Sequence, residues 1–379
     1  MSDKKELRID DVDKNLKLPT KLDKDDIVFY NARQKPFEIY GLCSPEAEGA
    51  FLRMPKEVGE AVSENLELLN KSTAGGRVRF STDSKYVAIK VKMPRPRVMN
   101  HMPATGSAGF DVYCDTDSGS YFCGILSPSF NIRGQSFETS IDFEKGGEFE
   151  TILNLHGEGV KNYTINFPTY SGFEELYIGL QESAFVGGGA KYAYDKPVLY
   201  YGSSITQGGC SSRPGTCYEA IISRKLNVDH VNLGFSGSGK GEPAMVEYIS
   251  TLDPLIFVCD YDHNAPNAEH LESTHWNLYE SFRAAHPTTP YVMITKPDFT
   301  KGHRLSTDEM KRRAVIHGNF MKGIEKGDKN LHFIDGESFF SGYADGADCT
   351  VDGCHPTDLG FFLMAERIGA TIKNILMKM

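Results

Sequence analysis

The spacing of apolar positions changes near the middle of the chain. From Ile27 to about Val186, short segments alternate apolar and polar residues or run apolar, and polar turn residues separate them. This spacing predicts an antiparallel β-sandwich of the jelly-roll type. The predicted strands are residues 77–82, 86–91, 109–113, 121–125, 149–155, 163–167 and 175–180, with a helical interruption at 55–69.

After the run Gly187-Gly188-Gly189, strand patterns alternate with helical patterns. Such alternation predicts an α/β fold, in which a parallel sheet is covered by helices on both faces. We therefore expect an all-β domain at residues 1–189 and an α/β domain at 190–379, with residues 1 to about 26 as a loose polar arm. The predicted strands are 198–201, 230–233, 255–259, 291–294 and 331–334, and the predicted helices are 217–226, 243–250, 268–286, 307–326 and 359–379.

Composition narrows the classes of partner and compartment. The 379 residues carry a formal net charge of -10, and the 41 Lys and Arg residues form no basic block, so we expect no nucleic acid partner. No apolar run approaches the ~20 residues that span a bilayer. The charged N-terminus lacks the apolar core of a signal peptide. We therefore expect no membrane partner and a cytoplasmic location.

The eight cysteines include no Cys-x-x-Cys pair, and no zinc spacing of histidines is present. In a reducing compartment such cysteines are expected to be free and mostly buried thiols. We accordingly expect neither a bound metal nor a cofactor.

Polar residues gather just after several predicted strands and ahead of the last helix. Ligands of parallel sheets bind at the carboxyl ends of the strands. Acyl transfer needs a nucleophile, a base, a group that orients the base, and donors for the oxyanion. Residues 202–206, 232–239, 260–264 and 352–356 contain all of these groups. The alternative for the first segment is that its serines and threonine only cap a helix.

These four segments resemble, in order, the sequence blocks of the SGNH hydrolases, also called GDSL-type esterases. The usual Gly-Asp-Ser is here Gly202-Ser203-Ser204, and the glycine of the second block is Gly237. The third block, usually Gly-x-Asn-Asp, retains only Asn264. The last block, Asp-x-x-His, is intact as Asp352 and His355. The resemblance covers the C-terminal half and implies a flavodoxin-like sheet.

The resemblance implies a role for each matched residue. Ser204 would attack an ester carbonyl, His355 would take its proton, and Asp352 would orient the imidazole. The backbone N–H groups of Ser204 and Gly237 and the side-chain amide of Asn264 would form the oxyanion hole. The hydroxyl of Ser203, which replaces the usual aspartate, is an alternative nucleophile.

A second resemblance concerns the first domain. Gly109-Phe110-Asp111-Val112-Tyr113 is similar to the Gly-x-Asp-Leu-Tyr signature of a β-sandwich domain that precedes a subgroup of SGNH esterases. Residues 204–210 and 212–215 resemble that subgroup as well. Two-domain enzymes of this plan resemble carbohydrate esterases that remove acetyl groups from sugars. The sandwich would either contribute residues to the rim of the site or be purely structural.

The implied function is therefore that of a carbohydrate O-acetylesterase, whose partner is a small-molecule or oligosaccharide ester. As substrate contacts we expect Arg213, Asp262 and His263; a solvated surface arginine and an anchoring role for Asp260 are the alternatives. A thioesterase or lysophospholipase is an alternative activity, and a carbohydrate-binding protein with an inactive hydrolase half is an alternative class. The sequence leaves open whether the protein forms a homo-oligomer.

Overall fold

Two antiparallel sheets form the first half of the chain, as the alternating pattern predicts. The computed structural model describes residues 20–130, 140–142, 144–297, 306–341 and 348–379. The strands of this half are β1 (Ile27–Asn31), β2 (Glu38–Tyr40), β3 (Arg77–Thr82), β4 (Tyr86–Met93), β5 (Phe110–Thr116), β6 (Gly119–Leu126), β7 (Ser129–Phe130), β8 (Ser140–Ile141), β9 (Gly147–Asn154), β10 (Lys161–Asn166), β11 (Glu175–Gln181) and β12 (Val186–Gly188).

The two main sheets enclose one apolar core. One sheet has the strand order β1-β11-β4-β9, and the other has the order β12-β3-β10-β5-β6, with β2 paired to β3. Alternate residues of facing strands, such as Phe80 of β3, Ile89 of β4 and Ile165 of β10, are fully buried between them. This arrangement confirms the predicted β-sandwich, because side chains of alternate positions point to one face of a sheet. The jelly-roll connectivity stays a prediction.

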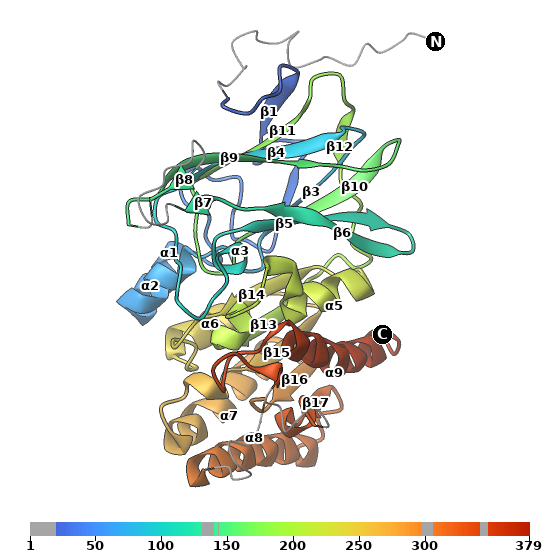
Figure 1. Ribbon diagram of the computed structural model, residues 1–379. Helices are drawn as coiled ribbons and strands as arrows, with labels where there is room; N and C mark the ends of the chain where they lie inside the picture. The colour runs from blue at the N-terminus through green and yellow to red at the C-terminus, as the bar shows by residue number, and fades with distance from the viewer. Residues whose placement is uncertain (1–19, 131–139, 143, 298–305, 342–347) are drawn as a thin grey trace.

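The second half is an α/β layer structure below the sandwich (Figure 1). Its parallel sheet has the order β14-β13-β15-β16-β17, which is the flavodoxin-like order. The strands are β13 (Val198–Gly202), β14 (His230–Gly234), β15 (Ile256–Asp260), β16 (Tyr291–Ile294) and β17 (Leu331–Ile334). The helices are α4 (Ser204–Gln207), α5 (Tyr218–Leu226), α6 (Pro243–Thr251), α7 (Ala268–Ala285), α8 (Thr307–Glu325) and α9 (Asp358–Leu376).

Helices cover both faces of this sheet. Val198 and Tyr200 of β13 pack in a cluster with residues of α5 and α9. The intervening Leu199 and Tyr201 pack in a different cluster, with residues of α6, α7 and α8. The chain leaves β13 for β14 on one side and returns to β15 on the other, so the topological switch point lies at β13. A crevice at the carboxyl ends of the strands is expected there.

The structure differs from the sequence predictions at short elements. The expected helix at 55–69 is two helices, α1 (Lys56–Val62) and α2 (Glu64–Asn70). Ser63 separates them because it is extended and its side chain accepts from the Leu66 N–H at 3.1 Å, as an N-cap does. Gly187 and Gly188 of the glycine run belong to strand β12, which pairs with β3. The boundary at residue 189 stays a prediction.

Two further predictions concern the arm and the membrane. The first 19 residues of the expected arm lie outside the described residues, but Thr20 donates to the Glu150 carboxylate at 2.6 Å. Among the helices of the described ranges, none has the length and apolarity needed to cross a bilayer.

Buried polar contacts join the sandwich to the α/β half. The fully buried carboxylate of Asp111 accepts from the Gly215 N–H at 2.8 Å and from Asn166 Nδ2 at 2.9 Å. Arg213 Nη1 lies 3.3 Å from the same carboxylate and donates to the Tyr113 hydroxyl at 2.5 Å. Two residues of the sandwich signature, Asp111 and Tyr113, therefore hold the segment that follows the turn after β13.

Arg53 makes a second buried connection. Its guanidinium donates to the Leu69 carbonyl at 2.7 Å and to the Gly234 carbonyl at the end of β14, and it lies 4.2 Å from the ring centroid of Phe235. Burial lowers its pKa to about 9. The carboxyl end of β14 is thus supported from the sandwich side.

We predict that Asp111→Ala destabilises both halves of the protein. The substitution leaves the Gly215 N–H and the Arg213 guanidinium without their buried acceptor, which should cost about 3 kcal/mol of unfolding free energy. Urea unfolding is followed by circular dichroism and by the fluorescence of Trp276, the single tryptophan, which lies in α7. Asp117→Ala, at an exposed turn position, is the control. If the urea midpoint measured by Trp276 fluorescence were the same in Asp111→Ala as in the wild type, the proposed coupling would be contradicted.

Candidate active site

The turn after β13 positions two adjacent serines differently. Ser203 is the N-cap of α4, and its hydroxyl accepts from the Ile205 N–H at 3.2 Å while the residue is fully buried. Ser204 is the first helical residue, so its N–H has no partner within the helix. The side chain that is available for chemistry is that of Ser204, whereas Ser203 serves as the helix cap.

Ser204 Oγ lies 2.8 Å from His355 Nε2. His355 Nδ1 lies in turn 2.7 Å from Asp352 Oδ2, and the His355 N–H donates to Asp352 Oδ1 at 2.8 Å. Although burial opposes the shift, these hydrogen bonds from His355 hold the pKa of Asp352 at about 2. A carboxylate at Nδ1 favours the tautomer whose Nε2 can accept the serine proton. The structure thus brings the three residues into one hydrogen-bonded chain.

Gly237 lies in the loop after β14, and Asn264, which ends a short 3₁₀ helix after β15, contacts the start of that loop. Gly237 has φ +68°, and no atom lies within 4 Å of the place that a Cβ would occupy. Asn264 Nδ2 donates to the Phe235 carbonyl at 2.8 Å, and the Phe235 N–H donates to the Gly202 carbonyl at 3.0 Å. An amide nitrogen carries two protons, so Asn264 retains a second donor. Their roles in an oxyanion hole stay predictions.

The expected substrate contacts lie in three environments. The Arg213 guanidinium is held by Asp111 and Tyr113, which favours a role in joining the domains. Asp262 is buried and accepts from the Lys296 N–H at 2.9 Å. His263 Nδ1 lies 3.8 Å from the thiol of Cys354, and Cys354 is the residue that precedes His355. Burial, and then the charge of Lys296, lowers the pKa of His263 to about 3, so its imidazole is neutral at pH 7.

Sequence reasoning missed the contribution of the first domain to this site. The His101 ring lies 5.4 Å, centroid to centroid, from the His355 ring. The buried Tyr170 hydroxyl lies 3.4 Å from the Ser204 carbonyl oxygen. Both residues are more than thirty positions from any catalytic block, and neither lies in a recognisable motif. Only the packing of the two halves could have identified them.

A cavity of about 600 Å³ includes Tyr170, the residue whose hydroxyl lies near the Ser204 carbonyl, in its lining, whereas Ser204, Asp352 and His355 do not line it. Residues of the sandwich loop 95–99 form one wall, and Ser236, which precedes Gly237, lies on another. Arg95 and Arg97 line this cavity together with Asn65, Glu144 and Tyr170. The sandwich therefore contributes charged and polar side chains to this cavity.

One set of side chains within the described ranges has metal-ligand spacing. Atoms of His101, Cys210 and His355 lie within 4.8 Å of one another. Burial raises the pKa of the Cys210 thiol to about 12, and metal binding needs the thiolate. His355 also has its two ring nitrogens next to Ser204 and Asp352. These residues therefore do not fit a metal well.

Comparison with family models gives two matches. Residues 195–373 match the GDSL-like lipase/acylhydrolase family. Residues 27–186 match the N-terminal domain of SGNH-hydrolase-type esterases. No curated protein matches the chain.

Solved structures of similar fold cover nearly the whole chain. A Bacteroides ovatus protein assigned to the GDSL-like lipases is 26% identical, with a TM-score of 0.80, over 92% of this chain and 98% of that one. A salicylyl-acyltransferase from a tetracycline biosynthetic pathway is 18% identical, with a TM-score of 0.72 and the same coverage. An acetyl xylan esterase from Butyrivibrio proteoclasticus is 12% identical, with a TM-score of 0.55, again over 92% and 98%.

We predict that a fluorophosphonate probe labels Ser204 and leaves Ser203 unlabelled. The neighbouring imidazole can accept the Ser204 proton, whereas the Ser203 hydroxyl is buried in its capping bond. Mass spectrometry of labelled peptides should show loss of labelling in Ser204→Ala and retention in Ser203→Ala, although the second variant loses about 1 kcal/mol of helix capping. Labelling that survives in Ser204→Ala would contradict the assignment.

Proposed function

Because the chain belongs to the GDSL-like lipase/acylhydrolase family and carries the N-terminal domain of SGNH-type esterases, we propose that this ester hydrolase is a carbohydrate O-acetylesterase in which Ser204 is the nucleophile. The observation that carries the proposal is the 2.8 Å contact of Ser204 Oγ with His355 Nε2, behind which Asp352 lies 2.7 Å from Nδ1. A serine is a weak nucleophile until an adjacent base takes its proton.

In the first half of the reaction, Ser204 Oγ attacks the acetyl carbonyl while His355 takes the hydroxyl proton. Charge develops on the carbonyl oxygen, and the N–H groups of Ser204 and Gly237 and the Asn264 amide donate to it. Collapse of this intermediate breaks the ester bond. His355 then gives its proton to the leaving sugar hydroxyl, and the acetyl group remains on Ser204.

In the second half, a water molecule attacks the acetyl-serine ester, and His355 takes a proton from this water. Collapse of the second intermediate releases acetate, and His355 returns the proton to Ser204 Oγ. Asp352 stays ionised throughout, since its pKa of about 2 lies far below the working pH. It stabilises the imidazolium that forms twice in the cycle.

Two observations support a sugar as the alcohol component. The cavity that Tyr170 and Ser236 line has polar and charged side chains, including Asn65, Arg95 and Arg97, among a few apolar ones. Such a lining suits a hydroxylated molecule better than a long acyl chain. The same two-part fold occurs in an acetyl xylan esterase and in family two carbohydrate esterases. This second support is an analogy of fold.

We predict that p-nitrophenyl acetate is hydrolysed by the wild type and that turnover is lost in Ser204→Ala and His355→Ala. Asp352→Asn should lower kcat by about 10⁴, because the imidazole then takes the wrong tautomer. Ser203→Ala is the matched control and should retain most activity. Full turnover in Asp352→Asn would contradict the role of this carboxylate in the mechanism.

We predict that Asn264→Ala lowers kcat about 10²–10³-fold without a large change in KM, as expected for a donor to the transition-state oxyanion. Steady-state kinetics on p-nitrophenyl acetate measure both parameters. A change confined to KM would remove Asn264 from the oxyanion hole.

The substrate class is tested by acetate release from acetylated xylo-oligosaccharides, compared with p-nitrophenyl esters of increasing chain length. We expect release from the oligosaccharides and a steep loss of rate beyond butyrate. Faster turnover of octanoyl esters or acyl thioesters, with no acetate released from the sugars, would favour the lysophospholipase or thioesterase alternative.

A further inference from the structure

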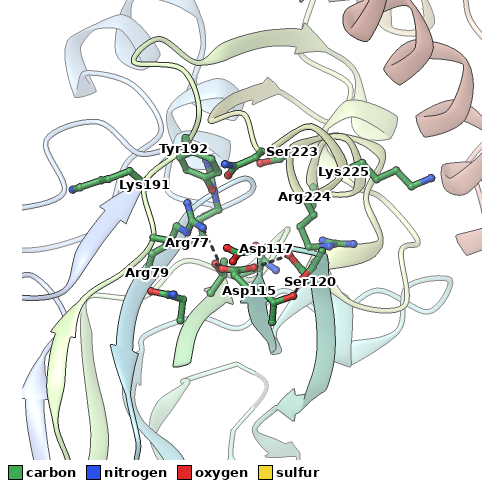
Figure 2. A pocket seen from close by; sticks show the side chains of 18 of the residues that line it. Arg77, Arg79, Asp115, Asp117, Ser120, Lys191, Tyr192, Ser223, Arg224 and Lys225 are labelled. Carbon is green, nitrogen blue, oxygen red and sulfur yellow. Dashed lines mark hydrogen bonds and ion pairs between the residues drawn. The ribbon is translucent and has the colours of Figure 1, made fainter. Parts of the chain in front are cut away.

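A second cavity lies away from the serine turn, between the sandwich and α5. Its volume is about 520 Å³, within the range of about 300–1,000 Å³ that is typical of small-molecule sites. None of Ser204, Gly237, Asn264, Asp352 and His355 lines it. Strands β3 and β10, the turn between β5 and β6, residues 190–192 and helix α5 form its walls (Figure 2).

The cavity is rich in cations although the protein is acidic. Two carboxylates line it, Asp115 and Asp117, and the net charge of the chain is -10. Five cationic side chains line it, namely Arg77, Arg79, Lys191, Arg224 and Lys225. A concave surface lined by one sign of charge attracts ligands of the opposite sign. An anionic ligand is therefore favoured.

Four of these cations form ion pairs with acidic residues, and one of the four is Arg79, which pairs with Asp115. Arg77 pairs with Asp229. Lys191 and Lys225 pair with Glu38 and Glu366, at more exposed positions. These pairs weaken the field of the four cations, so the case for an anion depends on the guanidinium nitrogens of Arg79 and Arg224 that lack a hydrogen-bond partner within the described ranges.

Arg79 is nine-tenths buried and has donors to spare. Its exposed fraction is 4%, and its Nε and Nη1 have no hydrogen-bond partner in the described protein. Its Nη2 lies 3.2 Å from Asp115 Oδ2. Asp115 also accepts from Ser120 Oγ at 2.7 Å and Thr164 Oγ1 at 2.5 Å. The carboxylate thus fixes the guanidinium of Arg79, whose Nε and Nη1 are buried without an acceptor in the described part of the chain.

Arg224 presents the same chemistry from α5. Its Nη1 is buried and has no partner among the described residues, and its guanidinium lies 4.0 Å from the Tyr113 ring centroid. A buried donor that lacks an acceptor is destabilising. A carboxylate between Arg79 and Arg224 would satisfy both, because charge-assisted bonds to Arg are the strong ones.

The rest of the lining suits a hydroxylated molecule. Asn162, Ser118 and Asn227 contribute amide and hydroxyl groups, and the Tyr192 ring stands beside them with the Arg79 guanidinium 4.2 Å from its centroid. His230 adds a buried Nδ1 without a described partner. Amides and hydroxyls can donate to and accept from sugar hydroxyls, while an aromatic ring gives an apolar surface.

We propose that this cavity is a non-catalytic binding site for a sugar carboxylate, that is, for a hexuronic acid unit, with Arg79 and Arg224 holding the carboxylate. The cavity is independent of the esterase chemistry, since its residues take no part in the Ser204 site. The hydroxyls of the ring contact the amides of Asn162 and Asn227.

The proposal is tested by isothermal titration calorimetry of the full chain with D-glucuronate, D-glucose and acetate. We expect saturable binding of glucuronate at one site, and binding of glucose and of acetate at least tenfold weaker. Arg224→Gln, at a half-buried position, should raise the Kd for glucuronate at least tenfold. Arg367→Gln, an exposed position on α9, is the matched control and should leave the Kd within twofold.

Folding of Arg224→Gln is checked by its hydrolysis of p-nitrophenyl acetate, which should equal that of the wild type within twofold. Arg79→Gln provides a second variant, on the opposite wall of the cavity, and should also weaken the binding of glucuronate. Absence of saturable glucuronate binding would overturn the proposal. Glucose or acetate bound as tightly as glucuronate, or an unchanged Kd in Arg224→Gln, would overturn it as well.

Discussion

Gly202, the last residue of β13, has no room for a side chain, and the position of Ser204 depends on that constraint. A Cβ on Gly202 would lie 2.0 Å from Thr206 Oγ1 and 2.5 Å from the Asp260 carbonyl oxygen. On the neighbouring strand, a Cβ on Gly234 would lie 2.2 Å from the Gln207 N. Helix α4 therefore packs directly on the ends of β13 and β14. Ser204 lies at the edge of the sheet because the backbone of α4 approaches the ends of these strands so closely.

The sandwich is part of the architecture of the candidate site. Asp111 and Arg213 fix the segment after the serine turn, and Arg53 supports the carboxyl end of β14. The loop at 95–102 brings Arg97 and His101 next to the α/β half. Between the same two halves, on the α5 side, lies the cationic cavity. Residues of both halves therefore line each of the two cavities.

The sequence predicted regular elements well where the pattern of burial was strong. The predicted strands 77–82 and 331–334 are those of the structure, since β-rich runs with clear turn residues mark them. The predicted helix at 55–69 is wrong in one respect: apolar spacing persists through Ser63, but the capping bond of this serine separates two helices. The short strands β1, β2 and β12 were not predicted, because their pairing depends on partners distant in the chain.

The chemistry was predicted unevenly for a similar reason. Ser204, Asp352 and His355 belong to ordered blocks, and the structure brings them within hydrogen-bond distance. The capping role of Ser203, the place of His101 and the contacts of Arg213 depend on packing that no local pattern encodes. Arg79 and Arg224 are separated by more than a hundred residues in the sequence, and they line the same cavity only once the chain has folded.

The central claim is that Ser204 carries the acyl group during turnover. Its most direct test is peptide mapping by mass spectrometry of enzyme quenched in acid during turnover of p-nitrophenyl acetate. The account predicts one added acetyl group on the peptide that contains Ser204, assigned to this residue by fragmentation and absent in Ser204→Ala. An acetyl group on Ser203 or Cys210, or one that persists at the same level in Ser204→Ala, would contradict it.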